Sequence, residues 1–128
     1  MTREQLNKLG TEIIGAAIEV HRELGPGLLE SVYEACLIEE LSEKGITAKS
    51  QVMIPIFYKG KKLNKSYKVD LLVVGEIILE LKCVDQLNPI HEVQLVTYLK
   101  LANKKLGYLL NFNVPVLRLG IKRKVNGI

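Results

Sequence analysis

Apolar residues recur every three or four positions in three stretches of the chain, which is the spacing of one face of an α-helix. Thr2 and Gln5 form a capping box at the start of the first stretch, and Gly25-Pro26 ends it. Gly45 ends the second stretch in the same way, and Asn88-Pro89 opens the third. The pattern therefore predicts three helices, over about 2–24, 28–44 and 88–103.

Between and after these helices, apolar residues alternate with polar ones or run continuously over short stretches, as is typical of β-strands. Strands are expected over 46–58, 65–74, 76–84 and 106–111, and 116–125 is a further candidate. Lys59-Gly60-Lys61-Lys62 and Gly75 mark the turns between the first three. A meander followed by a helical crossover makes a mixed sheet with helices on its faces. The sequence thus predicts a single α/β domain over residues 1–128, in the order α-α-β-β-β-α-β.

Composition narrows the functional classes without changing the fold class. The 128 residues carry a net charge of +4, which suits a polyanionic partner without requiring one. We expect no membrane span and no signal peptide, because no apolar run is long enough for either. Cys36 and Cys83 lack a metal-binding spacing, and we expect both to be reduced thiols in a cytoplasmic protein.

Charged side chains interrupt two neighbouring apolar strands. Asp70 stands alone on one of them, and Glu80 and Lys82 lie two apart on the next, so they point to the same face. Charges in such strands are costly to bury unless they are paired or bind a metal. An aspartate facing a Glu-x-Lys pair across adjacent strands is the layout of a metal-dependent site that cleaves phosphodiester bonds. A structural Glu80–Lys82 ion pair at a sheet edge is the alternative.

The element order and these charged residues resemble the PD-(D/E)XK nuclease superfamily, which has the restriction-endonuclease-like fold. Its D…ExK signature matches Asp70, Glu80 and Lys82. The chain resembles more closely a family named for its Gly-x-x-Glu-x-x-Tyr motif, which here runs from Gly27 through Glu30 to Tyr33. Further matches to that family follow in order over 94–99, 107–112 and 120–123.

The resemblance implies a nuclease that depends on Mg²⁺ or Mn²⁺. Carboxylate oxygens would hold the metal, and Lys82 would position the attacking water and stabilise charge on the phosphate. The implied metal ligands are Asp70, Glu80, the backbone carbonyl of Leu81, and Glu30. The implied catalytic residues are Glu30, Asp70, Glu80, Lys82 and Gln94, with Tyr33 and Tyr98 in supporting positions.

Helical spacing gives expectations for the residues that lie on helices. Glu30 shares a face with Tyr33 and the leucines that follow, so we expect it to point inward; a solvated acid at the helix N-terminus is the alternative. Tyr33 also fits core packing with its hydroxyl satisfied. Gln94 and Tyr98 lie four apart and share a face of the third helix.

Nucleic acid is the expected partner, with DNA favoured over RNA. Basic residues on the hairpin and in the C-terminal stretch are candidates for phosphate contacts, namely Lys61, Lys62, Lys65 and Arg123. Three functions stay open: an active nuclease, a non-catalytic module that binds nucleic acid or protein on the same fold, and a small dimeric junction-resolving endonuclease. The apolar third helix leaves a homodimer open as well.

Overall fold

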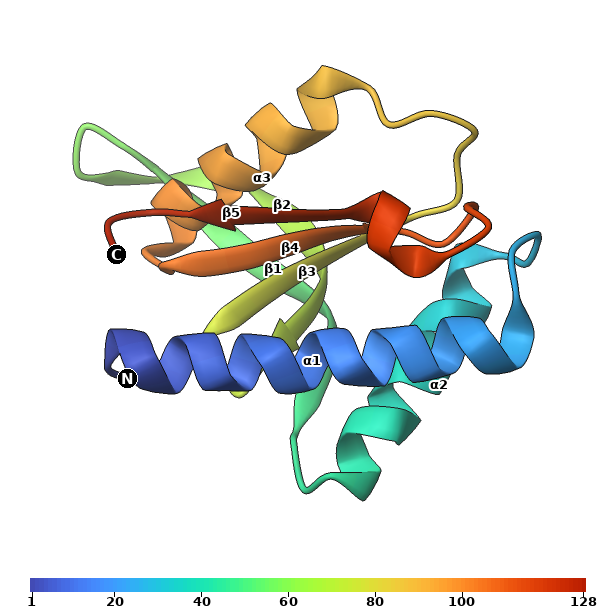
Figure 1. Cartoon of the computed structure of the whole chain (residues 1–128). Helices are drawn as coiled ribbons and strands as arrows, with labels where there is room; N and C mark the ends of the chain where they lie inside the picture. Colours follow the sequence, from blue (N-terminus) through green and yellow to red (C-terminus); the bar gives the residue numbers. More distant parts are fainter.

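Five strands form one sheet in chain order, and helices cover both of its faces (Figure 1). The computed structural model describes all residues, 1–128. Its strands are β1 (Ala48–Tyr58), β2 (Lys61–Val73), β3 (Ile77–Lys82), β4 (Leu106–Asn111) and β5 (Ile121–Val125). Only β3 and β4 are parallel neighbours. A parallel pair needs a crossover, and α3 (Pro89–Ala102) supplies it on the face opposite α1 (Arg3–Leu24) and α2 (Glu30–Glu43). The mixed α/β sheet expected from the sequence is confirmed.

Two apolar clusters fill the space on the two faces of the sheet. The larger contains 20 buried residues and lies under α1 and α2, and the smaller contains six and lies under α3. Successive residues of β3 supply both clusters, with Leu79 and Leu81 in the larger and Ile78 in the smaller. Glu80 and Lys82 alternate in phase with Ile78, so they leave the strand on the face of α3.

The helix boundaries follow local sequence signals. Thr2 and Gln5 form the predicted capping box, and the N–H of Gly25 donates to the carbonyl of His21 at the end of α1. The side chain of Asn88 caps α3 by accepting from the N–H of Ile90 at 3.0 Å. All three predicted helices are confirmed, each within two residues of its expected start and end. No helix is both long enough and apolar enough for a membrane crossing.

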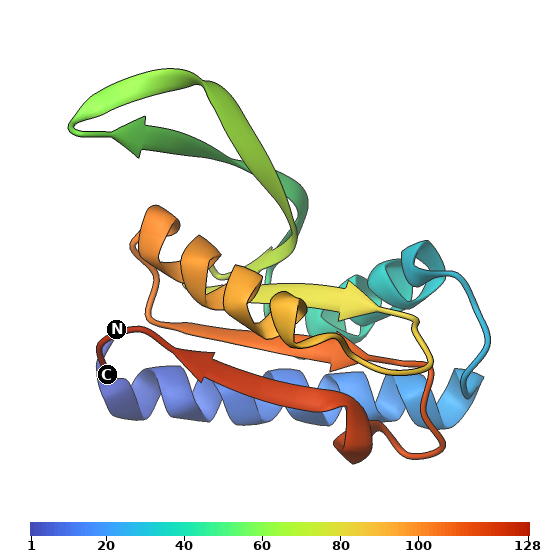
Figure 2. The same ribbon diagram turned by 90° about the horizontal axis from the view of Figure 1, so that it is seen from above.

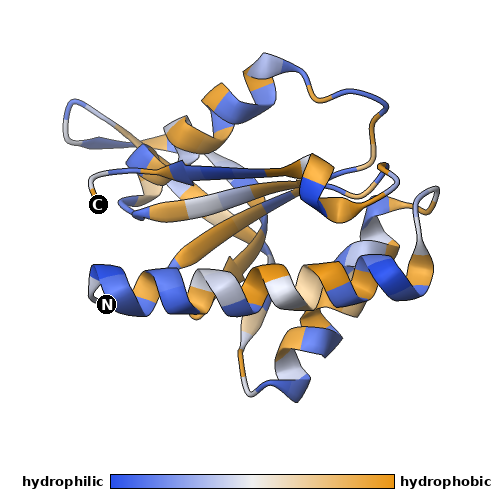
Figure 3. Cartoon of the chain, viewed as in Figure 1, coloured by the Kyte–Doolittle hydropathy of each residue, from blue (hydrophilic) through white to orange (hydrophobic).

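Two strand boundaries differ from the sequence expectation by more than two residues. The hairpin turn between β1 and β2 needs only Lys59 and Gly60, whose φ values of 49° and 79° are those of a tight two-residue turn, so Lys61 and Lys62 belong to β2. The stretch 116–125 is a strand only from Ile121, because Leu117–Gly120 forms a 3-10 turn (η1) that lets the chain reverse after β4. β5 is an edge strand and is mostly hydrophilic (Figure 3).

The hairpin of β1 and β2 extends well beyond the rest of the sheet (Figure 2). β3 pairs only with Leu71–Val73 of β2, so the remainder of β2 has β1 as its single neighbour. The ribbon also twists at this point, because Val69 packs in the cluster under α3 and Leu71 in the opposite cluster. Gln51, on β1 opposite the twist, has a φ of 53°. Asp70 therefore lies where the ribbon leaves the sheet.

Replacing either of two glycines with alanine is expected to change the stability of the fold, and the two changes have opposite signs. Gly120→Ala is expected to destabilise the protein by about 1–3 kcal/mol, because the added methyl group would overlap the carbonyl oxygen of Asn111. Gly15→Ala, in the middle of α1 with no other atom within 4 Å of the new Cβ, is expected to stabilise it by about 0.5–1 kcal/mol. Urea unfolding of both variants measures these changes. A Gly120→Ala protein as stable as the wild type would contradict the close approach of η1 to β4.

Candidate active site

Asp70 and Glu80 are neighbours at the point where β2 and β3 separate. The last paired residues of the two strands are Leu71 and Leu79, so Asp70 and Glu80 come next in the same register. The backbone N–H of Leu81 donates to Oδ2 of Asp70 at 2.8 Å. This hydrogen bond to a side chain replaces the next backbone pairing between β2 and β3, and it holds the Asp70 carboxylate against β3.

Glu80 is buried in an environment that disfavours its negative charge. Only 9% of the residue is exposed, and its Oε1 is buried without a hydrogen-bond partner. Burial, followed by the charge of Asp70 and a hydrogen bond with it, raises the pKa of Glu80 to about 9, although Lys82 acts in the opposite direction. A carboxylate oxygen that is buried without a donor is suited to a cation, because a cation supplies the missing partner.

The donor set fits a hard divalent cation held by two carboxylates. Mg²⁺ is commonly bound by one or two carboxylates while water and substrate phosphate complete its shell. Asp70 and Glu80 meet that requirement, and the unpartnered Oε1 of Glu80 is the observation that supports the fit. No group of three or more His, Cys, Asp or Glu side chains converges anywhere in the chain. The expected convergence of Glu30 with these two carboxylates into one ligand set is therefore not found.

Glu30 lies at the rim of the site instead of on the buried face of α2. The residue is exposed, which corrects the expected inward orientation; it begins α2, and the buried stripe starts only at Tyr33. Glu30 nevertheless lines the same hollow as Asp70 and Leu81. After burial, the charge of Glu30 is the second cause that raises the pKa of the Cys83 thiol, immediately after Lys82 in the chain. Glu30 thus faces the site from across the hollow.

Tyr33 belongs to the core and not to the site. It is fully buried and its ring stacks on Phe112 with centroids 4.4 Å apart. Its hydroxyl donates to the carbonyl of Gly25 and accepts from the N–H of Leu28. The Gly-x-x-Glu-x-x-Tyr motif therefore has a structural explanation. The hydroxyl of Tyr33 stabilises the turn between α1 and α2, and the end of that turn positions Glu30 at the rim of the site.

Tyr98 lies beside the carboxylates together with a residue that the sequence analysis missed, Tyr67. The two rings stack with centroids 4.1 Å apart, and the hydroxyl of Tyr67 donates to the carbonyl of Tyr98 at 2.7 Å. Burial raises the pKa of both tyrosines, and the charge of Glu80 contributes to each. The signal for Tyr67 was its place three residues before Asp70, on the side of the ribbon that faces α3.

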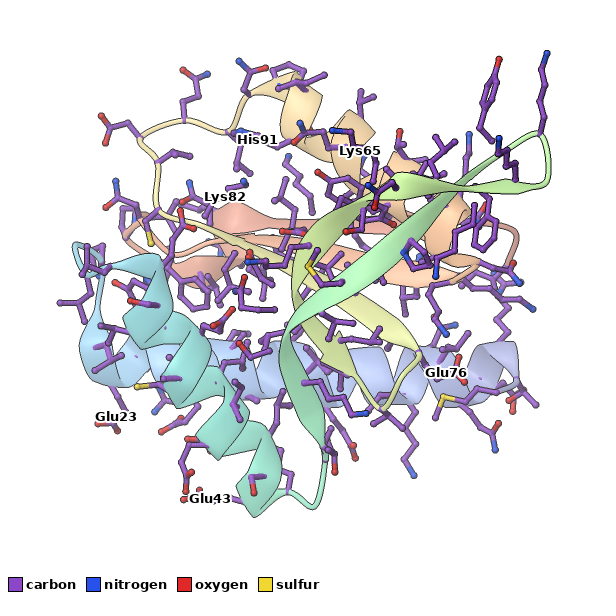
Figure 4. All side chains as sticks on the ribbon, turned by 180° about the vertical axis from the view of Figure 1, so that it is seen from behind. Glu23, Glu43, Lys65, Glu76, Lys82 and His91 are labelled. Atoms are coloured by element: carbon purple, nitrogen blue, oxygen red, sulfur yellow. The ribbon has the colours of Figure 1, made fainter.

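Gln94 and Lys82 lie on the α3 side of the site. Gln94 is exposed one turn before Tyr98, and no hydrogen bond connects its side chain to the carboxylates. Lys82 is half-buried, and Figure 4 shows it on the same side of the molecule as His91. The Nδ1 of His91 is buried and has no hydrogen-bond partner. Of the two α3 residues expected beside Lys82, Tyr98 stacks on Tyr67 near Glu80, and Gln94 is exposed.

Asn111 holds the chain that leaves Lys82, and sequence reasoning did not identify it. It is in register with Lys82 on the neighbouring strand and is 2% exposed. Its side chain accepts from the N–H of Val84 at 3.1 Å and donates to the carbonyl of Val84 at 2.9 Å. The available signal was a lone amide at the end of an otherwise apolar strand.

The predicted phosphate-binding residues lie in two separate places. Lys61, Lys62 and Lys65 are exposed on the projecting hairpin, from which the path along β2 leads back to Asp70. Arg123 is on the opposite face of the sheet, where its Nη2 donates to Oδ1 of Asn7 in α1 at 2.7 Å. The three lysines therefore lie together on the projecting hairpin, and Arg123 lies away from the site.

The five-stranded mixed sheet and the paired carboxylates on β2 and β3 define a restriction-endonuclease-like fold. A family model described as the PD-(D/E)XK nuclease superfamily matches residues 7–124. The chain belongs to the PD-(D/E)XK nuclease superfamily. Comparison with curated proteins and with solved structures finds no significant match. The matched range contains Asp70, Glu80 and Lys82, so the signature expected from the sequence lies inside the family assignment.

Proposed function

We propose that this chain is a metal-dependent nuclease that hydrolyses phosphodiester bonds in nucleic acid, and that it belongs to the family named for the Gly-x-x-Glu-x-x-Tyr motif. The observation that carries the proposal is the buried, unpartnered Oε1 of Glu80 beside the carboxylate of Asp70. A purely structural role gives no reason for such a pair, since burial and the charge of Asp70 both disfavour the ionised form of Glu80. The superfamily assignment supports the same conclusion.

Each residue of the site has a physical task under this proposal. Bound Mg²⁺ or Mn²⁺ would supply Lewis acidity toward the scissile phosphate and would lower the pKa of a bound water. Asp70 and Glu80 would hold the ion, with the carbonyl of Leu81 as a proposed third ligand, and the N–H of Leu81 keeps Asp70 in place. Lys82 stabilises negative charge that develops on the phosphate.

The surrounding residues orient and shield these groups. Tyr67 and Tyr98 cover one side of Glu80 and exclude water from it. Glu30 lines the same hollow but does not join the carboxylate pair, so it would act on a bound ion through its negative charge. Gln94 is left for contact with the substrate, since it is exposed on the same helix face as Tyr98.

Cleavage of a labelled panel of nucleic acids tests the proposal. The panel contains single-stranded, duplex and branched DNA together with RNA, each incubated with Mg²⁺ or Mn²⁺. The wild type is expected to cleave at least one member, and Lys82→Ala is expected to cleave it about 100- to 1,000-fold more slowly, because it lacks the charge that stabilises the transition state. Lys8→Ala, on the exposed side of α1, is the matched control and should retain the wild-type rate. Absence of cleavage in the wild type, or equal cleavage by Lys82→Ala, would reject the mechanism.

A further inference from the structure

Charge is distributed very unevenly along the chain. Residues 44–69 contain seven lysines and no acidic residue, whereas residues 1–43 contain nine acidic and three basic residues. The basic stretch forms β1 and most of β2, and the acidic stretch forms α1 and α2. A net charge of +4 thus combines a strongly basic hairpin with an acidic helical layer. Such a separation of charge orients a polyanion toward the hairpin and away from α1 and α2.

The part of the hairpin from Val52 to Val69, called the arm below, has two different faces. One face packs on α3 through Ile54 and Val69, with Tyr67 stacked on Tyr98. The opposite, outward face is exposed and combines lysines with apolar side chains. Its residues, as Cα partners across the ribbon, are Met53 with Lys68, Pro55 with Ser66, and Phe57 with Lys62.

The arm ends at the candidate active site. Asp70 follows Lys68 by two residues on β2, at the point where the ribbon twists. A shallow hollow in the arm is lined by Met53 and Lys62 of this face and by Lys65. At the base of the arm, Asp70 lines a second hollow, together with Glu30 and Leu81. The lysines of the arm thus lie along the same strand as Asp70, and that strand leads to the carboxylate pair.

The length of the arm can be compared with the repeat of a nucleic-acid duplex. A strand rises about 3.3 Å per residue, so Lys68 lies about 7 Å from Asp70 along β2 and Lys62 about 26 Å from it. Duplex DNA rises about 3.4 Å per base pair, so 26 Å corresponds to roughly 8 base pairs. The lysines can thus contact phosphates over most of one helical turn on one side of a cut made at Asp70.

We propose that the arm lies along the major groove of duplex DNA, with Lys62, Lys65 and Lys68 on the phosphates to one side of the cleavage point. The inference rests on the proposed function for the position of the cut. A two-stranded β-ribbon is one of the elements that the major groove of B-form DNA admits, whereas the major groove of A-form RNA is too deep and narrow. A single strand is bound by stacking on several aromatic rings, and the outward face offers only Phe57.

Equilibrium binding without metal tests this inference independently of cleavage. Fluorescence anisotropy in EDTA compares duplex DNA of about 6, 10 and 20 base pairs with duplex RNA and single-stranded DNA of the same lengths. Lys62→Gln/Lys68→Gln removes two charges from the arm, and Lys8→Gln/Lys105→Gln removes two exposed charges elsewhere. The arm variant is expected to bind the longer DNA duplexes at least about tenfold more weakly than the wild type. Its slope of log K against log salt is expected to be shallower by about 1.8, as for two lost phosphate contacts.

The outcomes separate this inference from the proposed function. The control variant should stay within about twofold of the wild type, and the shortest duplex should lose most of the effect of the arm because it ends before Lys62. Equal losses in both double variants, or equal binding of duplex RNA or single-stranded DNA, would overturn the inference. Arm-dependent DNA binding by a protein that never cleaves would reject the nuclease proposal alone. If the arm variant cleaves duplex DNA at the wild-type rate, the proposed role of the arm would be rejected and the nuclease proposal would stand.

Discussion

Replacing Glu80 with glutamine is expected to abolish measurable Mg²⁺ or Mn²⁺ binding and to slow cleavage by at least about 100-fold. Loss of a residue that only supports a metal ligand commonly costs about 10- to 100-fold, so loss of a ligand itself should cost at least as much. The reason is local. Oε1 of Glu80 is buried without any hydrogen-bond donor, so a cation is the partner it lacks, and a neutral amide cannot replace the charge. Titration calorimetry measures the binding, and the labelled substrates measure the rate.

The fold is expected to survive this change, which makes the result interpretable. Glutamine has nearly the same shape as glutamate, and its amide can donate a hydrogen bond to the adjacent Asp70. Glu76→Gln is the matched control, because Glu76 lies in the turn before β3, and Figure 4 shows it far from Lys82. The control should bind metal and cleave like the wild type. Metal binding that persists in Glu80→Gln would remove Glu80 from the site.

The metal-free wild type is expected to become less stable relative to Glu80→Gln as the pH rises from about 5 to about 8. The pKa of Glu80 is about 9 in the folded protein against an ordinary value of 4.5, chiefly because the side chain is buried and lies beside Asp70. Between these two values the folded state holds a proton that the unfolded state has released. Stability therefore falls with rising pH, because the unfolded state binds fewer protons.

Comparing the two proteins isolates this one group from the other titrating side chains. Glutamine resembles the protonated form of Glu80 at every pH, so the difference in unfolding free energy should be small near pH 5. It should grow to at least about 1 kcal/mol by pH 8, a difference of roughly 4 °C in Tm. Thermal unfolding in EDTA at a series of pH values measures it. A difference that stays constant across this range would contradict the buried, protonated state of Glu80.

The affinity for metal should rise with pH, whereas the stability of the metal-free protein should fall. A cation displaces the proton of Glu80, so Mg²⁺ is expected to bind more tightly as the pH rises toward 9 and to release a proton on binding at neutral pH. The apparent heat of binding should then depend on the ionisation enthalpy of the buffer. The same experiment on the Glu76→Gln control should give the wild-type dependence.

The fold and the central part of the site could be predicted because they depend on local patterns. The positions of Asp70, Glu80 and Lys82 on two adjacent strands followed from the alternation of side chains along a strand. The helix boundaries followed from capping residues that act within one turn. The crossover helix between parallel strands followed from the geometry of a mixed sheet. None of these inferences requires knowledge of which residues meet across the core.

The remaining parts of the site depend on contacts between residues far apart in the chain. Tyr67 reaches Tyr98 because the ribbon twists at Asp70 and turns its inner face toward α3. Asn111 reaches Val84 because β4 lies beside β3. Helical spacing placed Glu30 inward, but the turn fastened by Tyr33 makes it the first residue of α2 and leaves it exposed at the rim.

The sequence by itself determined the order of elements, the class of fold and the two carboxylates and lysine of the candidate site, since each is set by spacing along one strand or helix. Only the tertiary structure decided which basic residues lie on the hairpin that leads to that site and which lie on the far face of the sheet. Arg123 and the lysines of the arm are equally basic in the sequence, yet β5 turns Arg123 toward Asn7 on the far face of the sheet. The physical reason is that the face a side chain occupies depends on strand register and twist across the whole sheet, which local periodicity does not specify.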